Sequence, residues 1–509
     1  MFKTVSSFEH VLTVGAQHRA TMLRPKGRLC GRRQAGAISV VFALMLVVMI
    51  GFIGMSLDLG RVYNRKAELQ VVANVAALAA ANQLNGTAAG VANALLQAAN
   101  AANVLQFQYN QLAIDWSSAA LSFSTSSSGI WIDAGAAQAA PNGLLFVQAD
   151  TSKLDASFGA VDQLLLSVLS AALASTNVSA KAVAGRSTIN VAPLAVCALA
   201  NNLATSRANP GPPANTELLE YGFRRGVGYD LMQLNPNAST PENFVVDPFD
   251  PPGVPGVASN MAAGVVGPYA CSGQLAIPRI TGASITVGRP FPLGALYNQL
   301  NSRFDQYAGA ECSYATAPPD SNIKAFTYAS AVPWMSAIPG AQGAQSTTAS
   351  GKLWTIADPL PAPVGNVAAM YGPLWAYARA VPFGAYVPGA LEPAAGYAPF
   401  NTSDWATLYK PGAPSATISY PSGTSTPYKA ISGSTFQAPS SAHKGMAYRR
   451  VLNVALLSCP VPAGAIAPAT VLGIGKFLMT VPATATSLYV EFGGLASEQA
   501  LGGAVQLYP

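Results

Sequence analysis

Two short strings in this chain have the spacing of a serine nucleophile with a lysine base. They are Ser441-Ala-His-Lys444 and Ser321-Asn-Ile-Lys324. At this spacing a lysine can remove the proton of the serine hydroxyl. A serine-rich chain is expected to hold about one such match by chance, and neither string opens a clear helix. A serine hydrolase of this type is therefore a remote alternative.

Other catalytic patterns are missing from the sequence. No G-x-S-x-G string occurs, and neither Gly351-Lys352 nor Gly475-Lys476 is followed by Ser or Thr, as a phosphate-binding P-loop requires. Beyond the N-terminal segment His443 is the only histidine, so a Ser-His-Asp triad has a single candidate base. The sequence predicts no catalytic residue, no cofactor and no enzymatic activity.

The cysteines favour disulfide chemistry in an oxidising compartment. One, Cys30, precedes the long apolar run described below, and four follow it: Cys197, Cys271, Cys312 and Cys459. An even number of widely spaced cysteines in an exported domain indicates two disulfides, for which three pairings exist. We favour Cys271–Cys312, whose loop closure contributes about 4 kcal/mol, together with Cys197–Cys459. A metal site is a poor alternative and is not predicted, because the chain has no C-x-x-C pair.

A membrane span is predicted at residues 35–57, and it would hold the rest of the chain at a membrane surface. Ser39 and Ser56 are its only polar side chains. A helix of this length reaches about 35 Å, which is enough to cross a hydrocarbon core. No small-residue cleavage site follows the run, so we expect an uncleaved anchor rather than a secretory signal.

Charge gives the span an orientation. Residues 1–34 carry seven basic side chains against Glu9, and the rest of the chain has equal numbers of acidic and basic residues. The positive-inside rule then predicts a cytoplasmic N-terminus and places the bulk of the chain outside the cytoplasm, although Arg61, Arg65 and Lys66 beyond the span weaken this. Because the exterior has no basic excess, we expect no nucleic-acid partner. The start of translation, Met1 or Met22, is left open.

A helical stem is predicted at residues 58–110. Apolar residues recur there at helical spacing, Asn85-Gly86 is typical of a helix end, and a second helix is expected from Ala88 to Tyr109. The stripe has two interpretations that we hold equal. It packs against like helices of an assembly, or it docks on this protein's own domain.

A small α+β module is predicted at residues 111–192. Short strands are expected at 112–116, 120–124, 130–132, 144–149 and 178–184. One helix, Phe158 to Leu173, is expected to pack against their sheet.

Residues 193–509 are predicted to form a loop-rich, mainly β exterior domain, with its central strands at 448–458, 471–481 and 487–492. Its aromatic residues have two interpretations: most simply they fill irregular β cores, and alternatively they form a ligand-binding surface. They include Trp334, Trp354, Trp375, Trp405, Tyr371, Tyr377, Tyr386 and Tyr397.

The first 85 residues resemble the N-terminal anchor of the TadG-like proteins of Flp (tight adherence) pilus assembly. The family has an Arg-rich lead, a Gly-Ala-opened span, a DLGR-x-Y exit and an alanine-rich helix beginning LQ. Here the matching residues are Gly36, Asp58, Leu59, Gly60, Arg61, Tyr63, Leu69, Gln70, Ala76 and Ala77. Asn74 stands where the family usually has Asp. The resemblance proper covers about a sixth of the chain.

Two departures refine what the resemblance implies. Related pseudopilins that are cut by prepilin peptidase carry a Glu five residues after the processing Gly, and this chain has Val41 there. Many relatives also carry a von Willebrand A domain with a D-x-S-x-S metal motif. The strings starting at Asp115 and Asp150 lack its second serine. The resemblance therefore implies an uncleaved anchored member without that ion site.

Together these features predict an α+β protein with a single anchor. It is expected to be a non-enzymatic, inner-membrane component of Tad/Flp pilus assembly or secretion. Its expected partners are the lipid bilayer and other Tad/Flp subunits, reached through small residues of the span at Gly36, Ala43, Gly51 and Gly54. An adhesin-like binding protein with an unknown external ligand is the alternative.

Overall fold

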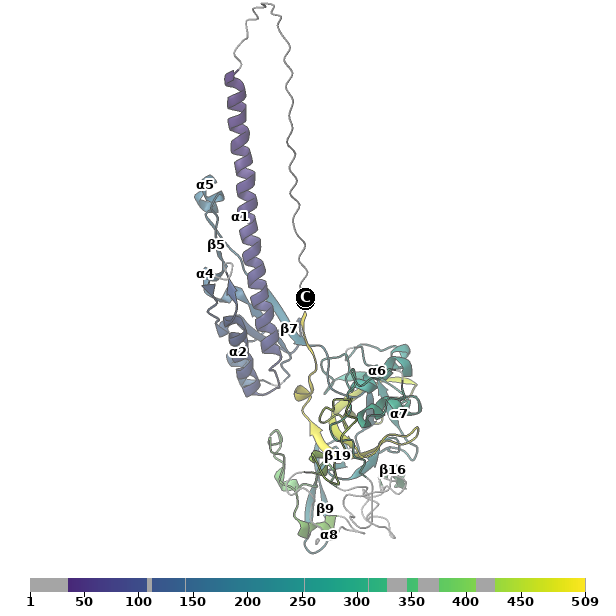
Figure 1. The fold of residues 1–509 in the computed structure, drawn as a ribbon. Coiled ribbons are helices and arrows are strands. Elements are labelled where there is room, and N and C mark those ends of the chain that lie inside the picture. Colours follow the sequence, from purple (N-terminus) through teal and green to yellow (C-terminus); the bar gives the residue numbers. More distant parts are fainter. Residues whose placement is uncertain are drawn as a thin grey trace, which may run out of the picture. The chain divides into compact units, whose positions relative to one another are not determined.

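A computed structural model describes residues 35–107, 112–141, 143–250, 252–309, 311–326, 346–355, 375–408 and 426–508 (Figure 1). The architecture is α+β, as predicted: one long apolar helix precedes a mostly β, loop-rich part with some helices. The chain divides into two compact units. The first holds the helix up to Arg61 together with Asp162–Ser175, and the second holds Val62–Val161 and the chain from Thr176 onward.

The predicted span and stem are one continuous helix, α1 (Ala35–Ala81). From Ile38 to Leu57 nearly every side chain is exposed, including all the large apolar ones. The described residues contain one helix that is long and apolar enough to cross a membrane. The side chains of the stem, by contrast, become buried at helical spacing, as Leu69, Val72 and Ala76 are.

The predicted break after α1 is present. Gly86 has a φ of 77°, a left-handed conformation that glycine adopts without strain. Thr87 then caps α2 (Ala88–Asn103) by accepting a hydrogen bond from the Gly90 N–H at 3.0 Å. The helix ends earlier than expected because the chain turns into β1 (Gln106–Phe107), which pairs with β2 (Leu112–Ala113). Tyr109 lies outside the described residues.

The stem packs on a four-stranded antiparallel sheet with the strand order β20-β7-β4-β3. The strands are β3 (Leu121–Ser124), β4 (Phe146–Asp150), β7 (Lys181–Arg186) and β20 (Val505–Tyr508). Apolar residues of α1, α2 and these strands share one buried core. The last strand comes from the C-terminal end of the described chain, a pairing that the local sequence pattern did not reveal. Short helices α3 (Ala134–Ala139) and η1 (Ser118–Ala120) complete this region.

The predicted helix from Phe158 to Leu173 is wrong. This stretch forms α4 (Ala156–Gly159), β5 (Ala160–Asp162), α5 (Leu166–Leu169) and η3 (Ala171–Leu173), and then returns as β6 (Ser175–Asn177). β5 and β6 pair as a hairpin. Tertiary contacts override the helix propensity of this Leu- and Ala-rich stretch, since its backbone hydrogen bonds are made across the hairpin and to α1.

The remainder is built on a seven-stranded sheet with the order β12-β19-β18-β14-β13-β8-β17. Its strands are β8 (Leu194–Cys197), β12 (Gly228–Asp230), β13 (Asn243–Val246), β14 (Ser284–Gly288), β17 (Val451–Leu457), β18 (Ile466–Met479) and β19 (Tyr489–Ala496). β18 pairs with both β14 and β17, so the pairings close into a ring through this strand. Three of these strands match the three central strands predicted from the sequence.

Both faces of this sheet are buried. Along β8 and β17, alternate residues such as Leu194, Val196 and Val454 enter one core, while Ala195 and Ala455 enter another. Strands buried on both sides are apolar at nearly every position, and such apolar runs can be recognised as strands in the sequence.

Smaller elements surround the sheet. They are the helices α6 (Ala263–Ser272), α7 (Leu293–Asn301) and α8 (Trp405–Leu408), the three-stranded sheet of β9 (Ala204–Asn209), β10 (Asn215–Glu220) and β11 (Phe223–Arg224), and the hairpin of β15 (Ser346–Ala349) and β16 (Lys352–Thr355). The 3₁₀ helices η4 (Ala258–Met261) and η5 (Ser302–Phe304) adjoin α6 and α7, and η2 (Thr151–Lys153) follows β4 in the four-stranded sheet.

Candidate functional site at the end of the span

Asp58 is the first charged residue after the apolar run of α1, and its side chain is almost fully buried, at 1 % exposure. Its carboxylate accepts three backbone hydrogen bonds from residues far along the chain. The N–H of Leu164 donates at 3.0 Å, that of Leu165 at 2.9 Å and that of Leu166 at 2.8 Å. These N–H groups begin α5, so Asp58 acts as a helix cap supplied by another helix. We call residues Asp162–Ser175 the apolar arm.

Two more residues of α1 hold the apolar arm. The Arg61 Nη1 donates to the Asp162 carbonyl at 2.7 Å. Gly54 gives the arm room, because a Cβ at this position would lie 2.7 Å from the Cβ of Leu165. Gly54 is therefore covered by the protein's own arm and is not free to contact another helix, which corrects our expectation for this residue. Gly51 has no atom within 4 Å of a Cβ built on it.

The other family-motif residues of the exit have no such contacts. Leu59 is 50 % and Tyr63 65 % exposed, and a Cβ on Gly60 would meet open space. Gly36 lies in the first turn of α1.

The stem residues of the motif face the protein's own core. Leu69, Ala76 and Ala77 are buried with the four-stranded sheet. The Gln70 Nε2 donates to the Asn74 Oδ1 and to the Lys181 carbonyl, both at 2.9 Å. The stripe therefore docks on this protein's own domain, which is the second of the two interpretations.

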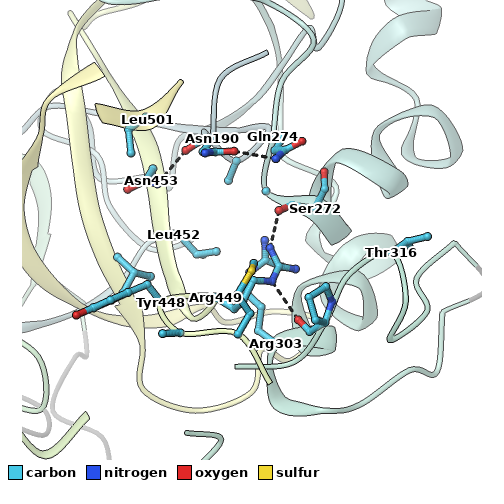
Figure 2. A pocket seen from close by; sticks show the side chains of 16 residues that line it. Asn190, Ser272, Gln274, Arg303, Thr316, Tyr448, Arg449, Leu452, Asn453 and Leu501 are labelled. Carbon is cyan, nitrogen blue, oxygen red and sulfur yellow. Dashed lines mark hydrogen bonds between the residues drawn. The ribbon is translucent and has the colours of Figure 1, made fainter. Parts of the chain in front are cut away.

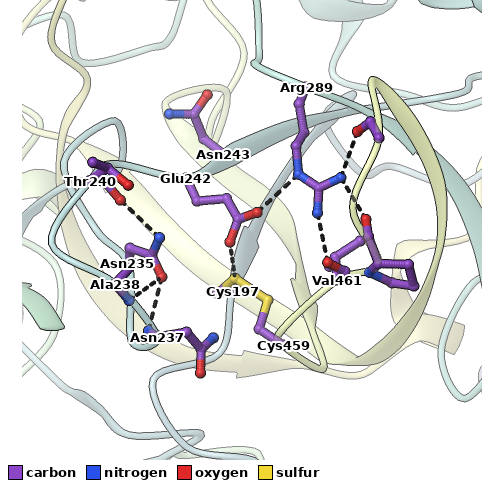
Figure 3. Close-up of polar contacts among 12 residues, drawn as sticks. Cys197, Asn235, Asn237, Ala238, Thr240, Glu242, Asn243, Arg289, Cys459 and Val461 are labelled. Atoms are coloured by element: carbon purple, nitrogen blue, oxygen red, sulfur yellow. Dashed lines mark hydrogen bonds and ion pairs between the residues drawn. A yellow bond between two sulfur atoms is a disulfide. The ribbon is translucent and has the colours of Figure 1, made fainter. Parts of the chain in front are cut away.

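The four exterior cysteines form two disulfides, Cys197–Cys459 and Cys271–Cys312. This is the pairing that the sequence analysis favoured. Beside the first, Glu242 Oε2 lies 3.7 Å from the Cys197 Sγ, and the Arg289 Nε donates to Glu242 Oε1 at 2.9 Å (Figure 3). Arg289 also donates to the carbonyls of Val461, Pro462 and Gly464. It thereby clamps the loop that follows Cys459.

Cys197, Glu242 and Cys459 are close enough to resemble a metal-ligand group. A cysteine binds a metal ion as a thiolate, however, and the sulfurs of Cys197 and Cys459 are bonded to each other. The arrangement is thus a disulfide with a neighbouring ion pair.

A polar cavity of about 380 Å³ lies between β17, the end of α6 and the segment around Thr316 (Figure 2). Arg449 lines it and donates to the carbonyls of Pro318, Ser272 and Cys271. Arg303 also lines it, donates to the Ala270 carbonyl at 2.8 Å, and leaves its buried Nε without a partner. Within the described chain neither guanidinium has a carboxylate within ion-pair distance. Burial lowers the pKa of both, most strongly that of Arg303. The hydrogen bonds of these two guanidinium groups join separate segments of the chain.

Sequence reasoning missed one histidine–carboxylate pair. His443 Nδ1 lies 2.6 Å from Asp305 Oδ1, and its ring stacks on Tyr314 with 4.3 Å between centroids. The partners are 138 residues apart, so no local pattern signals them. Among the described residues no hydroxyl or thiol hydrogen-bonds to the ring, and the Asp305 carboxylate is the group that orients His443.

The described structure joins neither S-x-x-K serine to its lysine by a hydrogen bond, neither Ser321 to Lys324 nor Ser441 to Lys444. Ser321 Oγ lies 3.4 Å from Asp320 Oδ1 instead.

Of the predicted aromatic residues, Trp375 is 1 % exposed and belongs to the main core, as the packing interpretation predicts. Tyr377 packs edge-on against Tyr428. Trp334 and Tyr371 lie outside the described residues, and the side chains of Trp354 and Trp405 are not described.

One buried carboxyl group holds the segment after Trp375. Glu491 on β19 is fully buried, and its oxygens accept hydrogen bonds from the N–H groups of Ala376, Tyr377 and Ala378 at 2.7 to 2.8 Å. Burial raises the pKa of Glu491 to about 8, against the opposing effect of these three donors.

The exposed apolar part of α1 is the one segment of the described residues that is long and apolar enough to cross a membrane, and the helix continues into a folded α+β part. Residues 36–83 match the family model described as putative Flp pilus-assembly TadE/G-like. The matched segment runs from the second residue of α1 to two residues beyond its end, so the predicted resemblance to TadG-like proteins is confirmed for this part of the chain. Neither a curated protein nor a solved structure matches the chain.

Proposed function

We propose that this protein is a membrane-anchored, non-enzymatic structural component of Flp/Tad pilus assembly or secretion. The observation that carries the proposal is the TadE/G-like match over residues 36–83, which coincides with α1. The exterior domain faces the periplasm, in accord with the basic residues that precede the span.

Two features of α1 support an anchoring role. Its first part exposes large apolar side chains such as Phe42, Leu44 and Val47 on a helix without charge before Asp58. Exposing such an apolar surface to water is unfavourable in free energy, whereas lipid acyl chains solvate it. Its second part is committed to the protein's own core, so contacts with other subunits fall to the span and to the exterior surface.

Within the span, small residues allow close approach of another helix. Ala43 is exposed and Gly51 has open space around it, while Gly54 is occupied by the apolar arm. Partner subunits of the pilus machinery therefore meet the span through the Ala43–Gly51 part.

The test is photo-crosslinking in cells that assemble the pilus. A photoreactive amino acid replaces Ala43, and in a matched control it replaces Ser126 of the exterior, which is also exposed. We expect the Ala43 position to capture single-span Tad/Flp subunits and the Ser126 position not to. Capture of lipid alone at Ala43 would contradict the proposed contact.

A further inference from the structure

The apolar arm presents large apolar side chains outward. Leu164 is 66 %, Val168 81 % and Leu173 44 % exposed. The twelve residues from Gln163 to Ala174 include no charged side chain, and the nearest charges along the sequence are Asp162 and Lys181. Such a cluster on an isolated hairpin marks a surface that is covered by something apolar.

The position of the arm identifies what covers it. Leu165 packs on Gly54, which lies three residues before the end of the apolar run of α1. Three residues of helix correspond to about 4.5 Å, so the arm lies beside the last turn of the span rather than beyond it (Figure 1). The exposed side chains of the arm are thereby continuous with the lipid-facing surface of α1.

The backbone of the arm suits an apolar surrounding. Backbone polar groups in lipid must be satisfied internally. Asp58 takes the N–H groups of residues 164–166, and the Gln163 N–H donates to the Ala174 carbonyl at 2.8 Å. The Ser167 hydroxyl donates to the Leu164 carbonyl at 2.9 Å, and Ser170 Oγ accepts from the Ala172 N–H.

We propose that the apolar arm enters the membrane leaflet at the C-terminal end of the span, with acyl chains covering Leu164, Val168 and Leu173. Asp58 and Arg61, at the exit of the span, are the residues that position it. The proposal requires α1 to span the membrane but does not depend on the pilus role.

Depth-dependent quenching tests this proposal on the full-length protein. Cys30 is replaced by Ser, and Val168→Cys is labelled with the environment-sensitive fluorophore NBD in phosphatidylcholine vesicles. Val168 is suitable because its side chain makes little contact with the protein. Leu44→Cys in the span and Ser126→Cys in the exterior are matched controls, and both positions are exposed.

We expect the Val168 label to emit at shorter wavelength than the Ser126 label. We also expect lipids that carry a nitroxide at acyl carbon 5 to quench the Val168 label at least twofold more strongly than the Ser126 label. Emission and quenching equal to those of the Ser126 label would overturn the proposal. The Leu44 label separates the two claims, because its failure to be quenched would reject the span itself.

Discussion

The carboxylate of Asp58 accepts a hydrogen bond from the backbone N–H of Leu164, a residue 106 positions further along the chain. Through this contact the first residue of the D-L-G-R exit motif has a structural role. The carboxylate ends the apolar run and, at the same point, caps the start of α5. The motif thus not only follows the apolar run of α1 but also holds a hairpin that is distant in the sequence.

Removing the Asp58 carboxylate should release the N-terminal end of α5. In Asp58→Ala three N–H groups lose their acceptor, so we expect the amides of residues 164–166 to exchange with solvent about tenfold faster or more. Asp58→Asn keeps one acceptor oxygen and should give a smaller increase. Hydrogen–deuterium exchange of the full-length protein in detergent micelles measures both.

Asp155→Ala is the matched control for that experiment. Asp155 caps α4 locally by accepting a hydrogen bond from the Ser157 N–H at 2.9 Å, and in the described structure it makes no hydrogen bond to residues 164–166. Equal exchange in the Asp58→Ala variant and the wild type would show that the cap does not hold the arm.

Two glycines of the span should respond differently to the same small change. Gly54→Ala places a Cβ 2.7 Å from that of Leu165, so the arm has to move, whereas Gly51→Ala meets open space. We expect Gly54→Ala to increase cleavage of the arm by a protease several-fold in micelles and Gly51→Ala to leave it unchanged. Identical cleavage of the two variants would contradict the packing of Leu165 on Gly54.

Glu491 should make the exterior less stable as the pH rises. Its pKa is about 8 in the folded protein and near 4.5 when unfolded, so between these values the folded state retains a proton that the unfolded state has lost. The free energy of unfolding then falls with rising pH, by at most about 1.4 kcal/mol per pH unit.

The Glu491→Gln variant isolates this contribution, because the amide is neutral throughout and its oxygen still accepts hydrogen bonds. Denaturant unfolding of wild type and variant from pH 5 to 8 gives the difference in slope. We expect the variant to lack the decrease, and parallel curves would show that Glu491 titrates normally.

The two disulfides should contribute unequally. The chain-entropy model gives about 5.6 kcal/mol for Cys197–Cys459 and about 4 kcal/mol for Cys271–Cys312, because the first closes the longer loop. Replacing each pair by serine should lower the free energy of unfolding in this order, while Cys30→Ser should have no effect. Peptide mapping under non-reducing conditions checks the pairing, and a mixed pairing would contradict the structure.

The sequence was most informative where one local rule dominates. The uncharged run before Asp58 predicts the span, and Asn85-Gly86 predicts the helix break that Gly86 and Thr87 make. Strands buried on both faces, as β17 is, appear as apolar runs of the right length and were placed within a few residues.

Long-range contacts explain what the sequence did not reveal. Leu164 to Leu173 has the composition of a helix. However, the carboxylate of Asp58 accepts hydrogen bonds from the N–H groups at the start of α5, and the residues on either side pair as the strands β5 and β6. Strand β20 pairs with β7 through Tyr508 and Val183, two residues whose spacing in the sequence has no signature. The Asp305–His443 pair was missed for the same reason.

We propose that this protein is a structural component of Flp/Tad pilus assembly. The most direct measurement counts surface pili by electron microscopy in cells that lack the gene. The same cells are also complemented with wild type or with the double variant Ser321→Ala and Ser441→Ala. We predict loss of pili on deletion and full restoration by both proteins, because the proposed structural role requires no serine nucleophile. Unchanged pili in the deletion strain would contradict the account.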